Sequence, residues 1–148
     1  MRSIRDRRGS PYRIRSVDGD DYAFDIAALL EKTELPRPKG EYDMQWWLAF
    51  FEDHPIAYLG IMRSLLVPQA AYLIRVGVLA AHRGNALQLR LMLCAERWAR
   101  RQGFASVVSD TTFNPPSANN FIRAGYQTWA PPAPWAFPAS IYWRKNLG

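Results

Sequence analysis

The order of apolar and polar positions along the chain predicts a mixed β-sheet with few helices. Runs in which apolar, β-branched or aromatic residues alternate or cluster are typical of strands. They fall at residues 12–15, 45–51, 56–62, 72–78, 104–109, 126–129 and 141–145. Apolar residues recur at helical spacing over 86–102, and a shorter helix is expected between Pro115 and Gly125. Together these elements predict one α/β domain with about six to seven strands, mostly antiparallel, and about four helices.

Turn and cap residues set the limits of several elements. Asp20 or Asp21 is expected to cap a helix. The apolar face of that helix is formed by Ile26, Leu29 and Leu30. Residues 52–55 separate two aromatic-rich runs and predict a hairpin. Between residues 72 and 110 the order strand, helix, strand predicts a central crossover that brings two parallel strands together.

Length and composition narrow the class of protein. A chain of 148 residues can bury a core without metal or disulfide support, and its single cysteine, Cys94, excludes an intramolecular disulfide. No apolar run follows the N-terminal arginines and none approaches the roughly 20 residues that cross a bilayer, so we expect a cytoplasmic protein without a membrane span. His54 and His82 have no metal-ligand spacing around them, and no metal is expected.

The net charge of +6 admits an anionic partner without identifying it. Part of the excess lies in the first residues, which lack apolar periodicity, so we expect residues 1–10 to form a flexible basic tail and residues 11–148 to form the domain. A solvated arm is favoured over an RNA-binding arm, and a nucleic-acid partner is not expected.

The most informative segment runs from Val78 to Gln88, where a predicted strand turns directly into a helix. Backbone N–H groups at a helix start lack intrahelical acceptors, and the helix dipole is positive there, so the turn suits a diphosphate. Gly84 permits close approach and Arg83 adds charge. The spacing fits neither the phosphate-binding P-loop nor the G-x-G-x-x-G dinucleotide turn. An ordinary loop is the alternative.

Residues 83–88 resemble the pattern with which the GNAT superfamily of acetyl-CoA-dependent N-acetyltransferases opens its central helix, although Ala86 and Gln88 stand where the family has glycines. Residues 114–126 resemble the family's second motif. The resemblance implies a GNAT-like fold over roughly residues 12–146 and acetyl-CoA as co-substrate. The cofactor-binding residues it implies are Val76, Val78, Arg83, Gly84, Asn85, Ala86, Leu87, Gln88, Asn114, Ser117 and Asn120. For Asn114 a helix cap is the alternative.

The resemblance also implies the reaction, in which a primary amine attacks the thioester and main-chain N–H groups near Val78 stabilise the acyl oxygen. Phe121 occupies the place of the tyrosine acid found in many members, and Phe121 cannot donate a proton. Ser117, Tyr126 or water are the candidates to protonate the thiolate. Asp110 is the candidate base, with a turn cap as the alternative.

Two proline-containing loops, 35–42 and 130–140, are where the family's acceptor selectivity usually resides. The residues they offer are Glu41, Tyr42, Trp135 and Phe137, which would suit a cationic acceptor with an apolar or aromatic part. The alternative is that these aromatic rings only close the core and do not contact an acceptor. The final strand or the Trp-rich loop could support a homodimer. Two alternative functions remain: a catalytically silent acyl-CoA-binding module, or an RNA-associated protein that uses the arginine arm.

Overall fold

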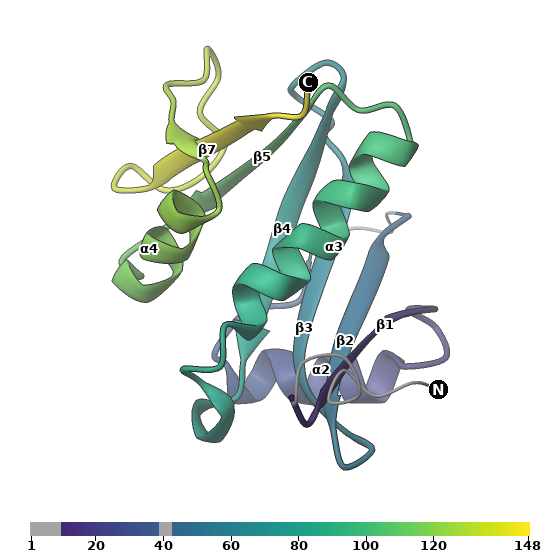
Figure 1. Cartoon of the computed structure of the whole chain (residues 1–148). Helices are drawn as coiled ribbons and strands as arrows, with labels where there is room; N and C mark the ends of the chain where they lie inside the picture. Colours follow the sequence, from purple (N-terminus) through teal and green to yellow (C-terminus); the bar gives the residue numbers. More distant parts are fainter. Residues whose placement is uncertain (1–9, 39–42) are drawn as a thin grey trace.

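The computed structural model describes residues 10–38 and 43–148 and contains one seven-stranded sheet in the order β1-β2-β3-β4-β5-β7-β6 (Figure 1). The strands are β1 (Tyr12–Val17), β2 (Gln45–Phe51), β3 (His54–Arg63), β4 (Ala70–Val78), β5 (Ser106–Thr111), β6 (Gln127–Thr128) and β7 (Ile141–Asn146). Among the described residues the helices are α2 (Ala23–Lys32), α3 (Leu87–Arg101) and α4 (Pro115–Arg123), with a 3-10 turn η1 (Ala80–His82). Of the strands in the described residues, only β4 and β5 pair in parallel. The predicted mixed sheet and its central crossover are confirmed.

The hairpin between β2 and β3 forms at the predicted place, but its turn is tighter than expected. Glu52 and Asp53 both have positive φ, 48° and 66°. Two consecutive left-handed residues are typical of the two-residue turn whose twist matches that of the flanking strands. As a result β3 begins at His54, two residues earlier than the sequence pattern predicts.

The predicted cap of the first helix is wrong. Helix α2 starts at Ala23, and its N-cap residue Tyr22 makes no side-chain cap bond. The carboxylate of Asp18 instead accepts hydrogen bonds from the backbone N–H groups of Asp20 at 2.8 Å and Asp21 at 3.3 Å. Both expected cap residues therefore lie in a turn that precedes the helix. The predicted apolar face of α2 is buried as expected.

Helices cover both faces of the sheet. Trp47 and Ala49 of β2 belong to the core cluster that contains Leu87 and Leu91 of α3, whereas the intervening Leu48 packs into the cluster of α2. Alternate residues of one strand point to opposite faces, so α3 and α2 lie on opposite sides of the sheet, as Figure 1 shows. In the described residues no helix is long and apolar enough to cross a membrane.

The sheet opens between its two parallel strands. β4 pairs with β5 only over Ala70–Tyr72, and beyond that point it continues to Val78 paired with β3 on one side only (Figure 1). A register shift against β3 leaves Ile74 as an extra, bulged residue. At the point of divergence the hydroxyl of Ser109 donates to the backbone carbonyl of Leu73 at 2.7 Å. No strand of the described part of the chain pairs with this edge of β4 beyond the fork.

Candidate functional site

A groove of about 440 Å³ follows the open edge of β4. It is lined by residues from four segments, 33–35, 76–78, 82–89 and 114–123, which bring together β4, the start of α3, the helix α4 and the end of α2. Its size is typical of small-molecule sites. Both sequence motifs therefore contribute to one groove, although they are separated by a helix and a strand in the chain.

Most of the predicted cofactor-binding residues line this groove. They are Val76, Val78, Arg83, Gly84, Ala86, Leu87, Gln88, Asn114, Ser117 and Asn120. Asn85 is not among the lining residues. Its side-chain amide donates to the backbone carbonyl of His82 at 3.0 Å and to the hydroxyl of Tyr12 at 3.2 Å. Asn85 thus holds the turn from within.

The turn before α3 aims free backbone donors at the groove. Gly84 has φ of 83°, and Ala86 adopts the left-handed conformation (φ 58°, ψ 23°) as the N-cap residue without a side-chain cap bond. The helix therefore begins at Leu87, one residue later than predicted. Its first intrahelical bond to the cap runs from the N–H of Arg90 to the carbonyl of Ala86 at 3.1 Å. The N–H groups of residues 87–89 have no intrahelical acceptor, which makes this helix start suited to an anion.

The first strand fixes the position of this turn. The hydroxyl of Tyr12 lies 2.9 Å from Nδ1 of His82, and Asn85 donates to the same hydroxyl. The ring of Tyr12 also packs edge-on against the His82 ring, with centroids 5.6 Å apart. Sequence reasoning missed this contact, because nothing in the local pattern indicates that β1 and η1 lie side by side.

A side-chain bridge links the start of α3 to α4. The Nε2 group of Gln88 donates to the hydroxyl of Ser117 at 3.1 Å, and Oε1 accepts from Nδ2 of Asn120 at 3.1 Å. All three residues line the groove. Gln88 occupies a position where the resembled family has glycine, and its side chain here serves to hold the two walls of the groove together.

The exposed stretch of β4 presents backbone donors as well. The N–H of Leu79 bonds to the carbonyl of Ile56 on β3 at 2.9 Å. Because successive N–H groups of a strand alternate in direction, those of Val76 and Val78 point away from β3, toward the edge that β5 has left. This edge forms one wall of the groove.

Asn114 acts as the N-cap of α4. Its Oδ1 accepts a hydrogen bond from the N–H of Ser117 at 3.2 Å, and two prolines occupy the first helical positions. The helix-cap alternative is therefore confirmed for Asn114, which also lines the groove.

The two candidate acids, Ser117 and Tyr126, lie in different surroundings. Ser117 is buried at the groove wall, whereas Tyr126 lies outside it and donates from its hydroxyl to Oε2 of Glu96 at 3.2 Å. Burial, reinforced by the charge of Glu96, raises the pKa of Tyr126 well above its usual value. Phe121 is fully buried and stacks on Trp143 with ring centroids 5.7 Å apart. Phe121, which stands where many members of the resembled family have a tyrosine acid, is therefore a core residue in this protein.

Asp110 lies within β5, on the other face of the sheet from α3. Its Oδ2 accepts hydrogen bonds from the hydroxyl of Tyr72 at 2.6 Å and from Nε1 of Trp135 at 2.8 Å. Its donors are side chains, so the alternative that Asp110 caps the following turn is wrong. Burial, and then the nearby carboxylate charge, raise the pKa of Tyr72 far above its usual value, which keeps its hydroxyl protonated as a donor.

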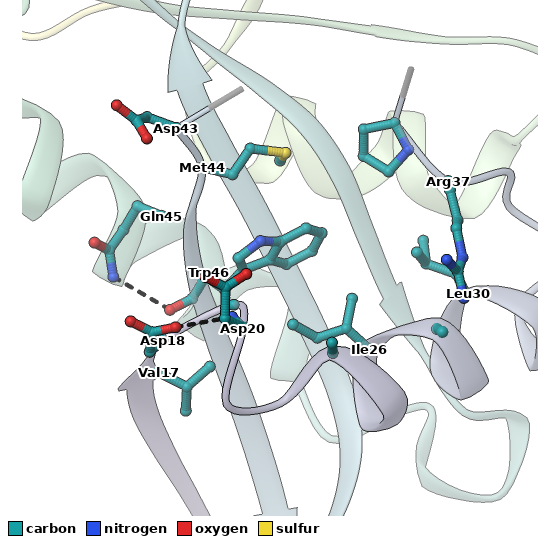
Figure 2. Close-up of a pocket in the computed structure, with 14 residues that line it drawn as sticks. Val17, Asp18, Asp20, Ile26, Leu30, Arg37, Asp43, Met44, Gln45 and Trp46 are labelled. Carbon is teal, nitrogen blue, oxygen red and sulfur yellow. Dashed lines mark hydrogen bonds between the residues drawn. The ribbon is translucent and has the colours of Figure 1, made fainter. Parts of the chain in front are cut away.

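A second hollow of about 550 Å³ lies between α2 and the start of β2 (Figure 2). The carboxylates of Asp18, Asp20 and Asp43 and the ring of Trp46 lie around it. Among the described residues that line it, none belongs to either motif. Glu41 and Tyr42, proposed from the sequence as acceptor contacts, and residues 1–9 of the proposed tail lie outside the described residues. The groove along β4 is therefore the candidate site.

The fold is that of an α/β protein whose sheet opens beside a helix N-terminus suited to an anion. A model described as the acetyltransferase (GNAT) family matches residues 8–126, and the chain belongs to this family. A comparison with curated proteins finds no significant match.

Solved structures of the same fold cover nearly the whole chain. One is a protein of Klebsiella pneumoniae classed as an acyl-CoA N-acyltransferase, with 23% identity and a TM-score of 0.73 over 93% of this chain and 98% of that one. A GNAT-family acetyltransferase of Staphylococcus aureus has 14% identity and a TM-score of 0.73 over 93% and 99%. The PaiA N-acetyltransferase of Thermoplasma acidophilum, in complex with coenzyme A, has 11% identity and a TM-score of 0.72 over 93% and 99%. At these identities the likeness shows a common fold.

Proposed function

We propose that this protein transfers an acetyl group from acetyl-CoA to the primary amine of a small molecule or peptide. Family membership supports acetyl transfer, and a solved protein of the same fold binds coenzyme A. The observation that carries the proposal is the meeting of two distant motifs in one groove, with a helix start at one end and the fork between β4 and β5 beside it. A cytoplasmic location and a homodimer remain predictions.

The groove offers partners for each part of the cofactor. The N–H groups of residues 87–89 and the exposed side chain of Arg83 would hold the pyrophosphate. The outward N–H groups of Val76 and Val78 would pair with the amide-bearing arm as a strand does. Arg123 of α4 lines the same groove and adds positive charge. These donors and charges fit a long anionic thioester.

In the proposed reaction the amine nitrogen forms a bond to the acetyl carbon, and the bond from that carbon to sulfur breaks. The amine gives up a proton and the departing thiolate takes one. At pH 7 deprotonating an alkylammonium costs about 4.6 kcal/mol, whereas forming a thiolate costs about 2 kcal/mol. Asp110 is the candidate for the first transfer. Ser117 or water would supply the second, because the hydroxyl of Tyr126 is engaged with Glu96 outside the groove.

The test uses the full chain, acetyl-CoA and a panel of primary amines, with release of free thiol as the readout. We expect amine-dependent thiol release, and we expect Arg83→Glu to raise the KM for acetyl-CoA. Titration of coenzyme A by calorimetry provides an independent measure of binding. Tight binding without transfer to any amine would instead identify a catalytically silent acyl-CoA-binding module, a reading that the buried Phe121 favours.

A further inference from the structure

The carboxylate of Asp110 is held at a meeting point of three separate segments. Tyr72 comes from β4, Asp110 from β5 and Trp135 from the loop between β6 and β7. Both donors bond to Oδ2, and no donor within the described residues reaches Oδ1. One oxygen is thus fixed by two hydrogen bonds, while the lone pairs of the other stay available to a ligand.

No Lys or Arg among the described residues forms an ion pair with this carboxylate. Residues 54–148, all of them described, carry ten Arg or Lys and only two acidic side chains, Glu96 and Asp110. Glu96 is paired with Lys145 at 2.7 Å, whereas Asp110 makes no ion pair. A partly buried charge without a counter-ion is unfavourable in a folded protein. Asp110 thus stays without an ion-pair partner in a segment rich in arginine, which points to a cation supplied from outside.

Aromatic residues adjoin the same carboxylate: Tyr72 and Trp135 donate to it, and Tyr142 is its cross-strand neighbour. The ring of Trp135 lies 5.8 Å from Tyr72 and 4.7 Å from Tyr142, both in edge-to-face geometry, and 6.1 Å from Trp129. Aromatic faces carry partial negative charge and attract organic cations, most strongly over tryptophan. The guanidinium of Arg144 already lies 5.0 Å from the centre of the Trp129 ring. The rings that remain for a ligand are therefore those of Trp135, Tyr72 and Tyr142. Carboxylate and rings together match an ammonium group attached to a carbon chain.

The cluster lies at the fork of the sheet. Tyr72 is the last β4 residue paired with β5, and its partner there is Val108. Asp110 lies two residues further along β5. Leu73 belongs to the core under α3, so Tyr72 and Asp110 point to the opposite face. A thioester lying in the groove along β4 would reach the fork from one side, and the amine would reach it from the side of Asp110.

Two exposed aromatic residues lie close to the cluster in sequence. Phe113 is 87% exposed and follows Asp110 by three residues, and Phe137 is 71% exposed and follows Trp135 by two. The loops that carry them are joined by the hydroxyls of Thr112 and Ser140, 2.6 Å apart. Such exposed rings offer apolar area that the non-polar part of a ligand can bury.

We propose that Asp110, Tyr72 and Trp135 form the binding site for the ammonium group of the acceptor, and that the acceptor is a primary amine attached to an apolar or aromatic group. This proposal rests on the proposed acetyl transfer and adds the acceptor class to it. Asp110 contacts the ammonium through Oδ1, and Tyr72 and Trp135 act as positioning residues that hold Oδ2.

The test uses phenethylamine without acetyl-CoA, because its ammonium carries the N–H groups that Oδ1 would accept and it cannot be acetylated when the acyl donor is absent. Its binding to the full chain is measured by calorimetry beside 2-phenylethanol, a neutral aromatic compound. We expect the wild type to bind the cation in preference to the alcohol, and Asp110→Asn to weaken cation binding about tenfold. Asparagine keeps one oxygen for the Tyr72 and Trp135 donors. Asp53→Asn removes the same charge from the distant β2–β3 turn and should leave cation binding unchanged.

Kinetics then separate this proposal from the proposed function. If phenethylamine is acetylated, Asp110→Asn should raise its KM while the dissociation constant of acetyl-CoA stays constant. Acetyl transfer with an unchanged KM and unchanged cation binding in Asp110→Asn would overturn the acceptor site and leave the proposed function supported. Cation binding that depends on Asp110, without transfer to any amine, would support the cation site and contradict the proposed function.

Discussion

The hydroxyl of Tyr12 lies 2.9 Å from Nδ1 of His82, seventy residues further along the chain. Asn85 donates to the same hydroxyl, so two groups of the turn, one from His82 and one from Asn85, meet at Tyr12. An edge strand in this way holds the turn that starts α3. The direction in which the free N–H groups of residues 87–89 point depends on the position of this turn.

Replacing Tyr12 by phenylalanine should loosen the turn. Tyr12→Phe keeps the ring packing against Phe51 and His82 but removes two hydrogen bonds, which contribute about 1 kcal/mol each. We expect a lower free energy of unfolding and several-fold weaker binding of coenzyme A, measured by urea denaturation and calorimetry. Tyr22→Phe is the matched control, because the Tyr22 hydroxyl makes no hydrogen bond within the described residues. Equal effects of the two variants would contradict a role of the hydroxyl in holding the turn.

Glycine at position 86 should stabilise the protein. Ala86 holds a left-handed conformation that costs an L-residue about 1–2 kcal/mol, partly offset by the greater unfolded-state freedom of glycine. We expect Ala86→Gly to raise the free energy of unfolding by about 0.5–1 kcal/mol. Ala28→Gly, at an exposed site inside α2, should lower it by about 1 kcal/mol. A destabilising effect at both positions would show that Ala86 is not strained.

Removing the Gln88 bridge should release α4 from the start of α3. Gln88→Ala deletes the bonds to Ser117 and Asn120, and we expect faster amide hydrogen exchange in residues 115–123 with a stability loss of roughly 1 kcal/mol. Gln102→Ala, at the exposed C-cap of α3, should leave exchange in α4 unchanged. Unaltered exchange in Gln88→Ala would mean that core packing alone holds α4.

Tyr126 should make the fold sensitive to alkali. Burial and Glu96 raise the pKa of its hydroxyl in the folded state, whereas in the unfolded chain it ionises near pH 10. Above that pH the unfolded chain loses its proton first, so the free energy of unfolding should fall as pH rises. Tyr126→Phe should flatten this slope between about pH 9.5 and 11.5 in urea titrations. Tyr22→Phe provides the reference slope, and identical slopes in the two variants would exclude this contribution.

Local pattern was sufficient for much of the fold. The apolar spacing of residues 86–102 and the strand patterns around it indicated the crossover, and the two motifs indicated which segments form the groove. Element limits were less well predicted, as at Ala86 and Asp20, because a left-handed cap or a local side-chain turn shifts a helix start without changing its apolar spacing.

By itself the sequence determined the order of the elements, the mixed sheet and the helix start rich in free donors, since these follow from the spacing of apolar residues and from backbone hydrogen bonding. Only the tertiary structure decided which side chains meet. It directed Tyr126 to Glu96, placed Asp110 between Tyr72 and Trp135, and joined Tyr12 to His82. Periodicity reports whether a residue faces a core, whereas a hydrogen-bond partner distant in sequence depends on how whole strands and loops pack.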